Sequence, residues 1–416
     1  MKVVVQKFGG TCVESEPNKL VTAERLMEAR DRGLHPVAVI SAMGREGQPY
    51  STVELVKTVL EVYPEIEPRE LDLLMSCGEI ISTVAMANLL QSKGYDSIAL
   101  SGGQAGLITD GYYGHARILK IEPAALLRAL QDGLMVFVAG FQGNTTDHQI
   151  TTLGAGGSDY TAVALTWIIN ETPRLPFGEK LEVEPLQIFK EVDGVMSANP
   201  KSLEAGEAAR TIPQLTYDEC VSMSRLGAEV LQHQAAQVAR ERGIEIEVRD
   251  FRDPGGGTRV GAVAPSAAAE AATAIADQPK LLVFDVAHAN PRLTLQIAER
   301  LERERLTVFQ VACGAPCTRF AVRPLKYRNV SAVVHRVLEP RGIKADVSVG
   351  DLAMVSVVGE SLRDHLEAWD KEAQGVLAKA KVSVHGSSEE AISLSYLVPE
   401  ADRTKAVTCL HKALIR

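Results

Sequence analysis

The sequence is poor in the features that mark several large classes of protein. Aromatic residues make up 5% of its 416 residues, and only two are tryptophan. No stretch reaches the ~18 uninterrupted apolar residues of a membrane span. Lysine and arginine are scattered and the net charge is −9, so nothing favours nucleic acid or an anionic membrane as a partner. Because no signal peptide follows Met1, we expect a cytoplasmic protein.

The cysteines give little support for a metal site or for a disulfide framework. The six cysteines lie far apart, which suits a reducing compartment, and only Cys313 and Cys317 are close in sequence. A C-x3-C pair without a second pair is weak as a metal site. We therefore predict no protein-bound metal.

The first half of the chain alternates between strand and helix patterns. Short apolar or β-branched runs predict strands, and longer runs with apolar residues at helical spacing predict helices. The expected strands cover 2–6, 36–41, 97–101 and 134–140, and the expected helices cover 18–33 and 67–91. Such alternation predicts an α/β domain with a largely parallel central sheet that binds ligands at the carboxyl ends of its strands.

The second half contains an internal repeat. TVFQVAC (307–313) matches KVSVHGS (381–387), and a similar helix follows each copy, which gives a period of about 75 residues. Each copy predicts a strand, a helix, two strands and a second helix. We therefore assign 1–262 to the first domain, 263–279 to a linker and 280–416 to the repeated units. The repeat fits either a site for a small ligand or a purely structural dimerisation module.

Two glycine-rich segments point to a phosphate. KFGGT (7–11) places a lysine at a strand end before two glycines and a hydroxyl, and TLGAGGSDYTA (152–162) exposes backbone N–H groups at the start of an expected helix. Neither is a Walker A loop, since G-x-x-x-x-G-K-[ST] is absent. KFGGT alone could be a tight turn, but the segments SAMG, SCGE and GFQG make chance a poor explanation for the whole set.

Taken together, these segments resemble the aspartokinases of the amino-acid kinase superfamily. The resemblance covers essentially the whole chain. It rests on KFGGTCV (7–13), SAMG (41–44), SCGEIIS (76–82), GFQG (140–143), TTLGAGGSDYTA (151–162) and VDGVMSANP (192–200). It implies an amino-acid kinase fold followed by paired ACT (βαββαβ) regulatory domains, and phosphoryl transfer from MgATP to the side-chain carboxylate of L-aspartate, the first step toward lysine, threonine and methionine.

The same resemblance implies roles for individual residues. Lys7 would neutralise charge on the transferred phosphoryl group, Asp159 would hold Lys7 in place, and Glu79 would receive the substrate's α-amino group. The remaining substrate-side positions are Thr11, Ser41, Phe141, Gly156 and Ser158. The remaining ATP-side positions are Gly9, Gly10, Lys190, Glu191, Met196 and Lys201. A solvated helix carboxylate is the alternative for Glu79.

Several positions depart from the family pattern. Ala155 stands where the family has an arginine for the α-carboxylate of the substrate, Asn199 replaces an aspartate, and Glu229 replaces a lysine near the nucleotide phosphates. Losing a charge-assisted partner costs about 1.5–3 kcal/mol. Arg45, His148, Lys190 and Lys201 are candidates to replace the lost positive charge. Residues 174–187 form an unusual insert relative to the family pattern. A kinase for a related amino compound without a free α-carboxylate and a non-catalytic regulatory subunit are therefore alternatives.

A regulatory site is expected in the second repeat. The segment VHGSSEEAIS (384–393) offers Ser387, Ser388 and Glu389 to an amino-acid effector in an ACT pair. Similar pairs in the family also form the dimer interface, so we expect a homodimer.

Overall fold

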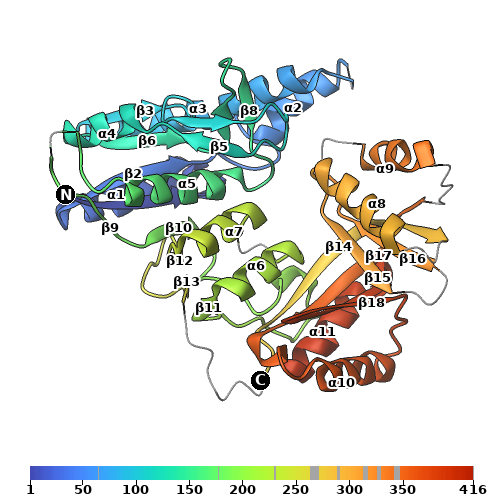
Figure 1. Cartoon of the computed structure of the whole chain (residues 1–416). Helices are drawn as coiled ribbons and strands as arrows, with labels where there is room; N and C mark the ends of the chain where they lie inside the picture. Colours follow the sequence, from blue (N-terminus) through green and yellow to red (C-terminus); the bar gives the residue numbers. More distant parts are fainter. Residues whose placement is uncertain are drawn as a thin grey trace. The chain divides into compact units, whose positions relative to one another are not determined.

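The computed structural model describes residues 1–63, 65–176, 178–228, 231–262, 271–287, 291–312, 317–325, 329–341 and 347–415. The chain forms two compact units (Figure 1). The first comprises Met1–Val195, Pro213–Tyr217 and Leu231–Val263, and the second comprises Met196–Ile212, Asp218–Val230 and Ala264–Arg416. Each unit is therefore assembled from three separate stretches of chain.

A largely parallel sheet forms the centre of the first unit. The hydrogen-bonded order is β11-β13-β12-β10-β1-β2-β6-β3, and β9 pairs with β1. Only the β12–β13 pair is antiparallel. The strands are β1 (Lys2–Phe8), β2 (Leu34–Ile40), β3 (Ser97–Leu100), β6 (Met135–Ala139), β9 (Glu182–Val183), β10 (Leu186–Lys190), β11 (Gln214–Thr216), β12 (Ile246–Asp250) and β13 (Thr258–Gly261). This arrangement confirms the predicted α/β class.

Helices cover the sheet because its strands are apolar on both sides. Leu26 of α1, Met86 of α3 and Phe137 of β6 belong to one buried cluster, whereas α5 contacts β1, β2 and β10. Residues that alternate with the cluster along the strands, such as Val5 and Val39, are also fully buried. The helices of this unit are α1 (Glu16–Asp31), α2 (Thr52–Leu60), α3 (Pro68–Ser92), α4 (Ala124–Gln131), α5 (Gly157–Glu171) and α7 (His233–Arg242).

A small second sheet in this unit carries the start of the glycine loop. Its order is β5-β4-β7-β8, with strands β4 (Leu107–Thr109), β5 (Ile118–Ile121), β7 (Gln142–Asn144) and β8 (Ile150–Thr152). Strands β7 and β8 form an antiparallel hairpin. Helix α3 contacts β8, so this long helix touches both sheets.

Helix α3 is also long and apolar enough to cross a membrane by length and composition alone. Half of its most apolar window is buried inside the fold. It also buries the carboxylates Asp72 and Glu79. These properties are those of a core helix.

The second unit is built around a closed barrel of six strands in the order β14-β16-β15-β18-β19-β17. The two halves repeat strand, helix, strand, strand, helix, which confirms the predicted repeat. They comprise β14 (Ala274–Ala287), α8 (Pro291–Arg303), β15 (Val308–Ala312), β16 (Cys317–Val322) and α9 (Val330–Leu338), then β17 (Val347–Val358), α10 (Leu366–Lys379), β18 (Ser387–Glu390), β19 (Ser393–Pro399) and α11 (Arg403–Leu414). Helix α6 (Tyr217–Arg225) belongs to this unit except for its first residue.

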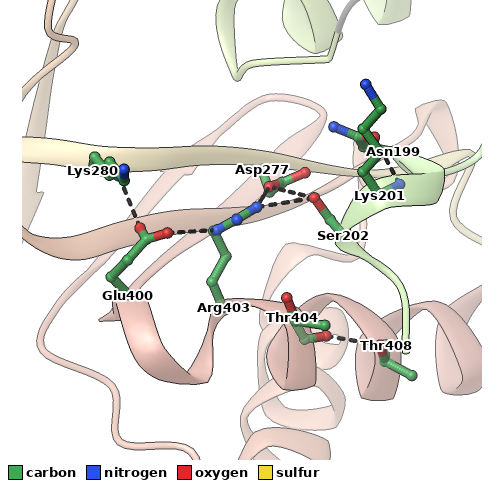
Figure 2. Close-up of polar contacts among 9 residues, drawn as sticks. All are labelled: Asn199, Lys201, Ser202, Asp277, Lys280, Glu400, Arg403, Thr404 and Thr408. Atoms are coloured by element: carbon green, nitrogen blue, oxygen red, sulfur yellow. Dashed lines mark hydrogen bonds and ion pairs between the residues drawn. The ribbon is translucent and has the colours of Figure 1, made fainter. Parts of the chain in front are cut away.

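The segment Met196–Ile212 is fixed to this barrel by polar contacts (Figure 2). Arg403 of α11 pairs with the buried carboxylate of Asp277 on β14. The Ser202 hydroxyl donates to the same carboxylate at 2.9 Å. A backbone bridge between Ala198 and Ile275 adds a parallel contact. Ser202 and Ala198 therefore tie this segment to β14 of the barrel.

Two predictions about element boundaries need correction. The linker does not extend to residue 279, because β14 begins at Ala274 and pairs with β17 from that residue onward. Residues 381–387 are not a strand: the strand begins only at Ser387, after Lys381 and Gly386 with positive φ. The effector segment 384–393 therefore contains the whole of β18 and the first residue of β19, which pair as a hairpin, rather than one loop.

Candidate active site

The carboxyl ends of four parallel strands meet at one edge of the large sheet. Their registers align Phe8 of β1 with Ile40 of β2 and Phe189 of β10, and Ile40 with Ala139 of β6. Backbone hydrogen bonds continue into the loops, from Gly9 N–H to the Phe189 carbonyl at 3.3 Å and from Gly140 N–H to the Ile40 carbonyl at 3.0 Å. Three glycine-bearing loops are therefore brought together, as the sequence predicted.

A buried ion pair lies at this edge. The Lys7 Nζ is 2.8 Å from Asp159 Oδ1, and the two residues are only 7% and 4% exposed. Asp159 lies in the first turn of α5, where the helix dipole favours a negative charge. Burial would raise the pKa of the Asp159 carboxyl, but the charges of Lys7 and Lys190, together with the hydrogen bonds that the carboxylate accepts, hold this pKa below its usual value. The carboxylate therefore stays ionised and fixes the lysine.

Glycine is required where the loops approach one another. A Cβ on Gly10 would lie 2.8 Å from the Ala42 carbonyl oxygen and 3.0 Å from that of Gly44. A Cβ on Gly140 would lie 2.6 Å from the Ser158 hydroxyl oxygen. The Lys7 ammonium lies close to Gly9, since a Cβ there would be 3.9 Å from Nζ. The bare backbone and the fixed ammonium together suit a phosphate group.

Glu79 is a second buried carboxylate of this region. It is 3% exposed, and its Oε1 accepts a hydrogen bond from the Ala42 N–H at 3.2 Å. Its Oε2 has no hydrogen-bond partner in the described structure. Burial raises the pKa of this carboxyl to about 8, although the Ala42 N–H acts in the opposite direction. A carboxyl with one unsatisfied oxygen is suited to an ammonium group supplied by a ligand.

The neighbouring polar groups are held by backbone contacts. Ser41 donates its N–H to the Phe8 carbonyl at 3.1 Å, and its own carbonyl accepts from the Ser82 hydroxyl at 2.6 Å. Phe141 has a φ of 69° and donates its N–H to the Thr161 hydroxyl at 3.1 Å. A positive φ is costly for an aromatic residue, so the fold imposes this geometry. The Phe141 ring packs beside Val56, Leu71 and Met75.

The glycine loop turns at Gly154 and Gly156, whose φ values are 78° and 75°. Between them Ala155 is exposed. Leu153 donates its N–H to the Phe141 carbonyl at 2.8 Å, and Asp159 donates its N–H to the Gly156 carbonyl at 2.9 Å. The loop is therefore anchored at both ends. Ala155, which stands where the family pattern has an arginine, lies on its exposed side.

The predicted nucleotide-side residues are divided between the two units. Lys190 and Glu191 belong to the first unit, where Glu191 pairs with Arg45. Met196 and Lys201 belong to the second unit; Met196 forms an isolated bridge with Thr211, and Lys201 lies in the short 3-10 helix Pro200–Ser202. Their roles stay predictions.

The remaining predicted positions stand as follows. Thr11 lies in the 3-10 helix Gly10–Val13, where its carbonyl accepts from Asn18 at 2.8 Å. His148 is exposed in the turn between β7 and β8. Glu229 lies outside the described residues.

Sequence reasoning missed Asp72, a third buried carboxylate. It lies on α3 and is 1% exposed. Its Oδ2 accepts from the N–H groups of Gly114 and Thr152 at 2.9 and 2.7 Å, and its Oδ1 accepts from the Thr152 hydroxyl at 2.8 Å. The available signal was its spacing of seven residues from Glu79, which puts both carboxylates on one face of the helix.

Comparison with known proteins shows the family of this chain. The amino acid kinase family matches residues 2–250. The chain belongs to the amino acid kinase family. Aspartokinase 1 of Bacillus subtilis is 31% identical over 421 residues, which cover 99% of this chain and 98% of that protein. An aspartokinase of Mycobacterium tuberculosis is 30% identical over 446 residues, covering 99% and 96%.

A solved structure has the same fold over the whole length of this chain. The structure of E. coli aspartokinase III in complex with aspartate and ADP matches with a TM-score of 0.76 and 21% identity, covering 100% of both chains. The lysine and aspartate complex of the same enzyme matches with a TM-score of 0.65. The fold, including its C-terminal pair of repeats, is thus that of the aspartokinases.

Proposed function

We propose that the chain transfers the γ-phosphoryl group of MgATP to the side-chain carboxylate of L-aspartate, which yields 4-phospho-L-aspartate and ADP. The buried Lys7–Asp159 pair at the glycine-lined sheet edge carries the proposal. A P–O bond forms to the carboxylate while the β,γ-bridging P–O bond breaks. The attacking carboxylate is ionised at neutral pH, so the reaction needs no general base and depends on positioning and charge neutralisation.

The described side chains suit this division of labour. Lys7 supplies a fixed positive charge beside the phosphoryl group, and the bare backbone of Gly9 lies close to the same ammonium. Glu79 binds the α-ammonium group of the amino acid. Mg²⁺ enters with ATP and takes ligands from its phosphates.

A second candidate follows from Ala155. The exposed methyl group at this position cannot pair with an α-carboxylate, whereas the amine partner Glu79 is present and unsatisfied. A kinase for an amino compound whose α-carboxyl is blocked or absent fits this combination.

The deciding experiment is a substrate panel with the purified full chain and MgATP. Aspartate, aspartate amidated at its α-carboxyl and β-alanine are compared by ADP release and by hydroxylamine trapping of the acyl phosphate. Turnover highest with aspartate supports the first proposal, and turnover highest with an analogue supports the second. No turnover with any compound would indicate a non-catalytic subunit.

We also propose that the second unit binds an amino-acid effector. A cavity of ≈ 160 Å³ is lined by Arg225, Glu302, Phe309, Ser388, Glu389 and Glu390 among others. It includes two of the predicted effector residues, and Ser387 lies next to them in β18. Thermal stabilisation by lysine, threonine or diaminopimelate would support this site; no shift with any proteinogenic amino acid or diaminopimelate would count against it.

A homodimer in the cytoplasm completes the proposal. Light scattering after size-exclusion chromatography measures the dimer, and a mass of one chain at micromolar concentration would contradict it.

A further inference from the structure

The carboxylate of Asp72 joins two parts of the first unit that are distant in sequence. It accepts three hydrogen bonds, one from the 110–116 segment through Gly114 and two from Thr152 at the end of β8. Both Asp72 and Thr152 are buried, at 1% and 0% exposure, so water does not compete for these bonds. Asp72 is therefore a fixed attachment point on α3.

Thr152 is the residue from which the glycine loop starts. Leu153 follows with its own backbone bond to Phe141, and the chain then turns at Gly154 and Gly156 before α5. Glycine residues give such a loop many alternative conformations. The position of its first residue therefore decides where the loop's N–H groups and Ser158 lie.

The same helix carries Glu79. Asp72 and Glu79 are seven residues apart, roughly 10.5 Å along the helix axis and on the same face. Between them, the Ser76 carbonyl accepts from the Gln142 side chain of β7 at 2.9 Å. Helix α3 thus fixes the distance between Glu79, which binds the amino group of the substrate, and the glycine loop, which faces the rest of the amino acid.

We propose that Asp72 is a positioning residue that sets the glycine loop relative to Glu79, and thereby sets affinity for the amino-acid substrate. The inference deepens the proposed kinase function and depends on it. Asp72 acts through Thr152 and touches no substrate. The predicted nucleotide-side residues Gly9, Gly10 and Lys190 lie after β1 and at the end of β10, and none of them bonds to this carboxylate.

The chain offers a matched set of variants. Asp72→Ala removes all three bonds, whereas Asp72→Asn can keep them, since its amide oxygen accepts the two N–H groups and its NH₂ donates to the Thr152 hydroxyl. Thr152→Val removes one bond and keeps the strand. Ser97→Ala is the control, because it deletes a buried hydroxyl that bonds the Tyr95 carbonyl at 2.8 Å near the far end of α3.

Steady-state kinetics separate positioning from general stability. We expect Asp72→Ala to raise the KM for aspartate about tenfold, which is about 1.4 kcal/mol, with the KM for ATP within twofold of wild type. Asp72→Asn stays within threefold of wild type, Thr152→Val is intermediate, and Ser97→Ala changes neither KM. Equal changes in both KM values, or no change in Asp72→Ala, would overturn the proposal.

Amide hydrogen exchange tests the positioning role of Asp72 without measuring catalytic turnover. Peptides covering 150–159 should exchange faster in Asp72→Ala than in wild type, and at the wild-type rate in Asp72→Asn. If the wild-type chain does not phosphorylate aspartate, the proposed function fails while this measurement still decides whether Asp72 holds the loop. Unchanged exchange in Asp72→Ala and Thr152→Val would overturn the positioning role.

Discussion

Lys7 shows how burial converts a flexible side chain into a fixed charge. A lysine on the surface loses much of its effect to solvent, whereas the Lys7 ammonium is held 2.8 Å from Asp159 in a nearly dry environment. We expect Lys7→Ala to lower kcat by at least about a hundredfold, because a preorganised charge aimed at the transition state is lost.

This first prediction is measured as kcat per folded molecule, with folding checked by circular dichroism, because Asp159 is left buried without its partner. The control is Lys2→Ala on the same strand, where the ammonium is exposed and 3.9 Å from Glu184. A Lys7→Ala enzyme as active as wild type would contradict the assigned role.

Glu79 makes substrate binding depend on pH. Because the pKa of its carboxyl is raised to about 8, it is mostly protonated at pH 6–7 and must lose its proton to bind an ammonium group. The KM for aspartate should therefore fall as pH rises from 6 to 8, with proton release on binding measurable in buffers of different ionisation enthalpy. A flat KM profile for wild type would contradict this role.

The same carboxyl should limit stability at high pH. A raised pKa in the folded state stabilises the fold fully below the ordinary value of 4.5, and this contribution is lost as pH rises through about 8. Glu79→Gln does not titrate, so it should be more stable than wild type above pH 8, by a few kcal/mol at most at 1.36 kcal/mol per pKa unit. Its aspartate turnover should be lost. Denaturation at pH 5 and pH 8.5 measures the difference.

Position 155 allows a test of how an α-carboxylate is bound. Its methyl group is exposed between two glycines, so an arginine fits without displacing the core. We expect Ala155→Arg to lower the KM for aspartate about tenfold, the equivalent of about 1.4 kcal/mol, if the chain is an aspartate kinase. Ala155→Met, which has a long uncharged side chain, is the control. If Ala155→Arg slows turnover of the substrate that the wild-type chain prefers and does not lower the KM for aspartate, the result favours a substrate without an α-carboxylate.

At the scale of elements, the loops after β1 and β2 are built to touch. Gly10 leaves no space for a methyl group against the carbonyls of Ala42 and Gly44, and Gly44 donates its N–H to the Gly10 carbonyl at 3.2 Å. We expect Gly10→Ala to separate these loops, at a cost of about 1–3 kcal/mol in unfolding free energy, and to raise the KM for ATP.

A matched control is available in the same unit. Gly133 lies after α4 with no atom within 4 Å of an added Cβ, so Gly133→Ala tests only the strain of its φ of 77°. Normal ATP binding in a folded Gly10→Ala protein would show that the close approach of the loops is not needed for the nucleotide.

Helix α3 shows where sequence patterns succeed and where they stop. Apolar spacing predicted its 25 residues almost to the end, because a helix that packs against two sheets must be apolar over much of its surface. The pattern does not indicate that Asp72 would accept three hydrogen bonds, since its donors come 42 and 80 residues later in the chain. The strand predicted over 381–387 was wrong. The residues favour β-structure, but Lys381 and Gly386 adopt positive φ and turn the backbone there.

At the scale of the whole molecule, each unit draws on three stretches of chain. The segment Met196–Ile212 begins shortly after β10, yet its side chains Ser197, Ser202 and Glu207 bond within the C-terminal unit. The Ser197 hydroxyl and the buried His411 imidazole lie 2.8 Å apart, and the His411 Nδ1 is 2.8 Å from Glu207. Covalent continuity thus joins β10 to a segment that the C-terminal repeats stabilise.

Arg403 is the centre of that stabilisation (Figure 2). Removing it leaves the Asp277 carboxylate, which is 5% exposed, without its ion partner. We expect Arg403→Ala to lower the unfolding free energy by about 3–5 kcal/mol in urea denaturation. Arg336→Ala breaks an exposed pair with Glu304 in the same unit and should cost less than about 1 kcal/mol. Equal effects of the two variants would contradict a buried network.

The sequence by itself determined the α/β class, the repeat, the glycine loops and the residue types of the site, because these depend on local periodicity and on short motifs. The family resemblance already implied that Asp159 holds Lys7, and the structure shows the two side chains 2.8 Å apart. Only the tertiary structure decided that Glu79 keeps one oxygen unsatisfied and that Met196–Ile212 belongs with the C-terminal repeats. Hydrogen bonds and ion pairs form between groups that the folded backbone brings within about 3 Å, and no local pattern encodes that proximity.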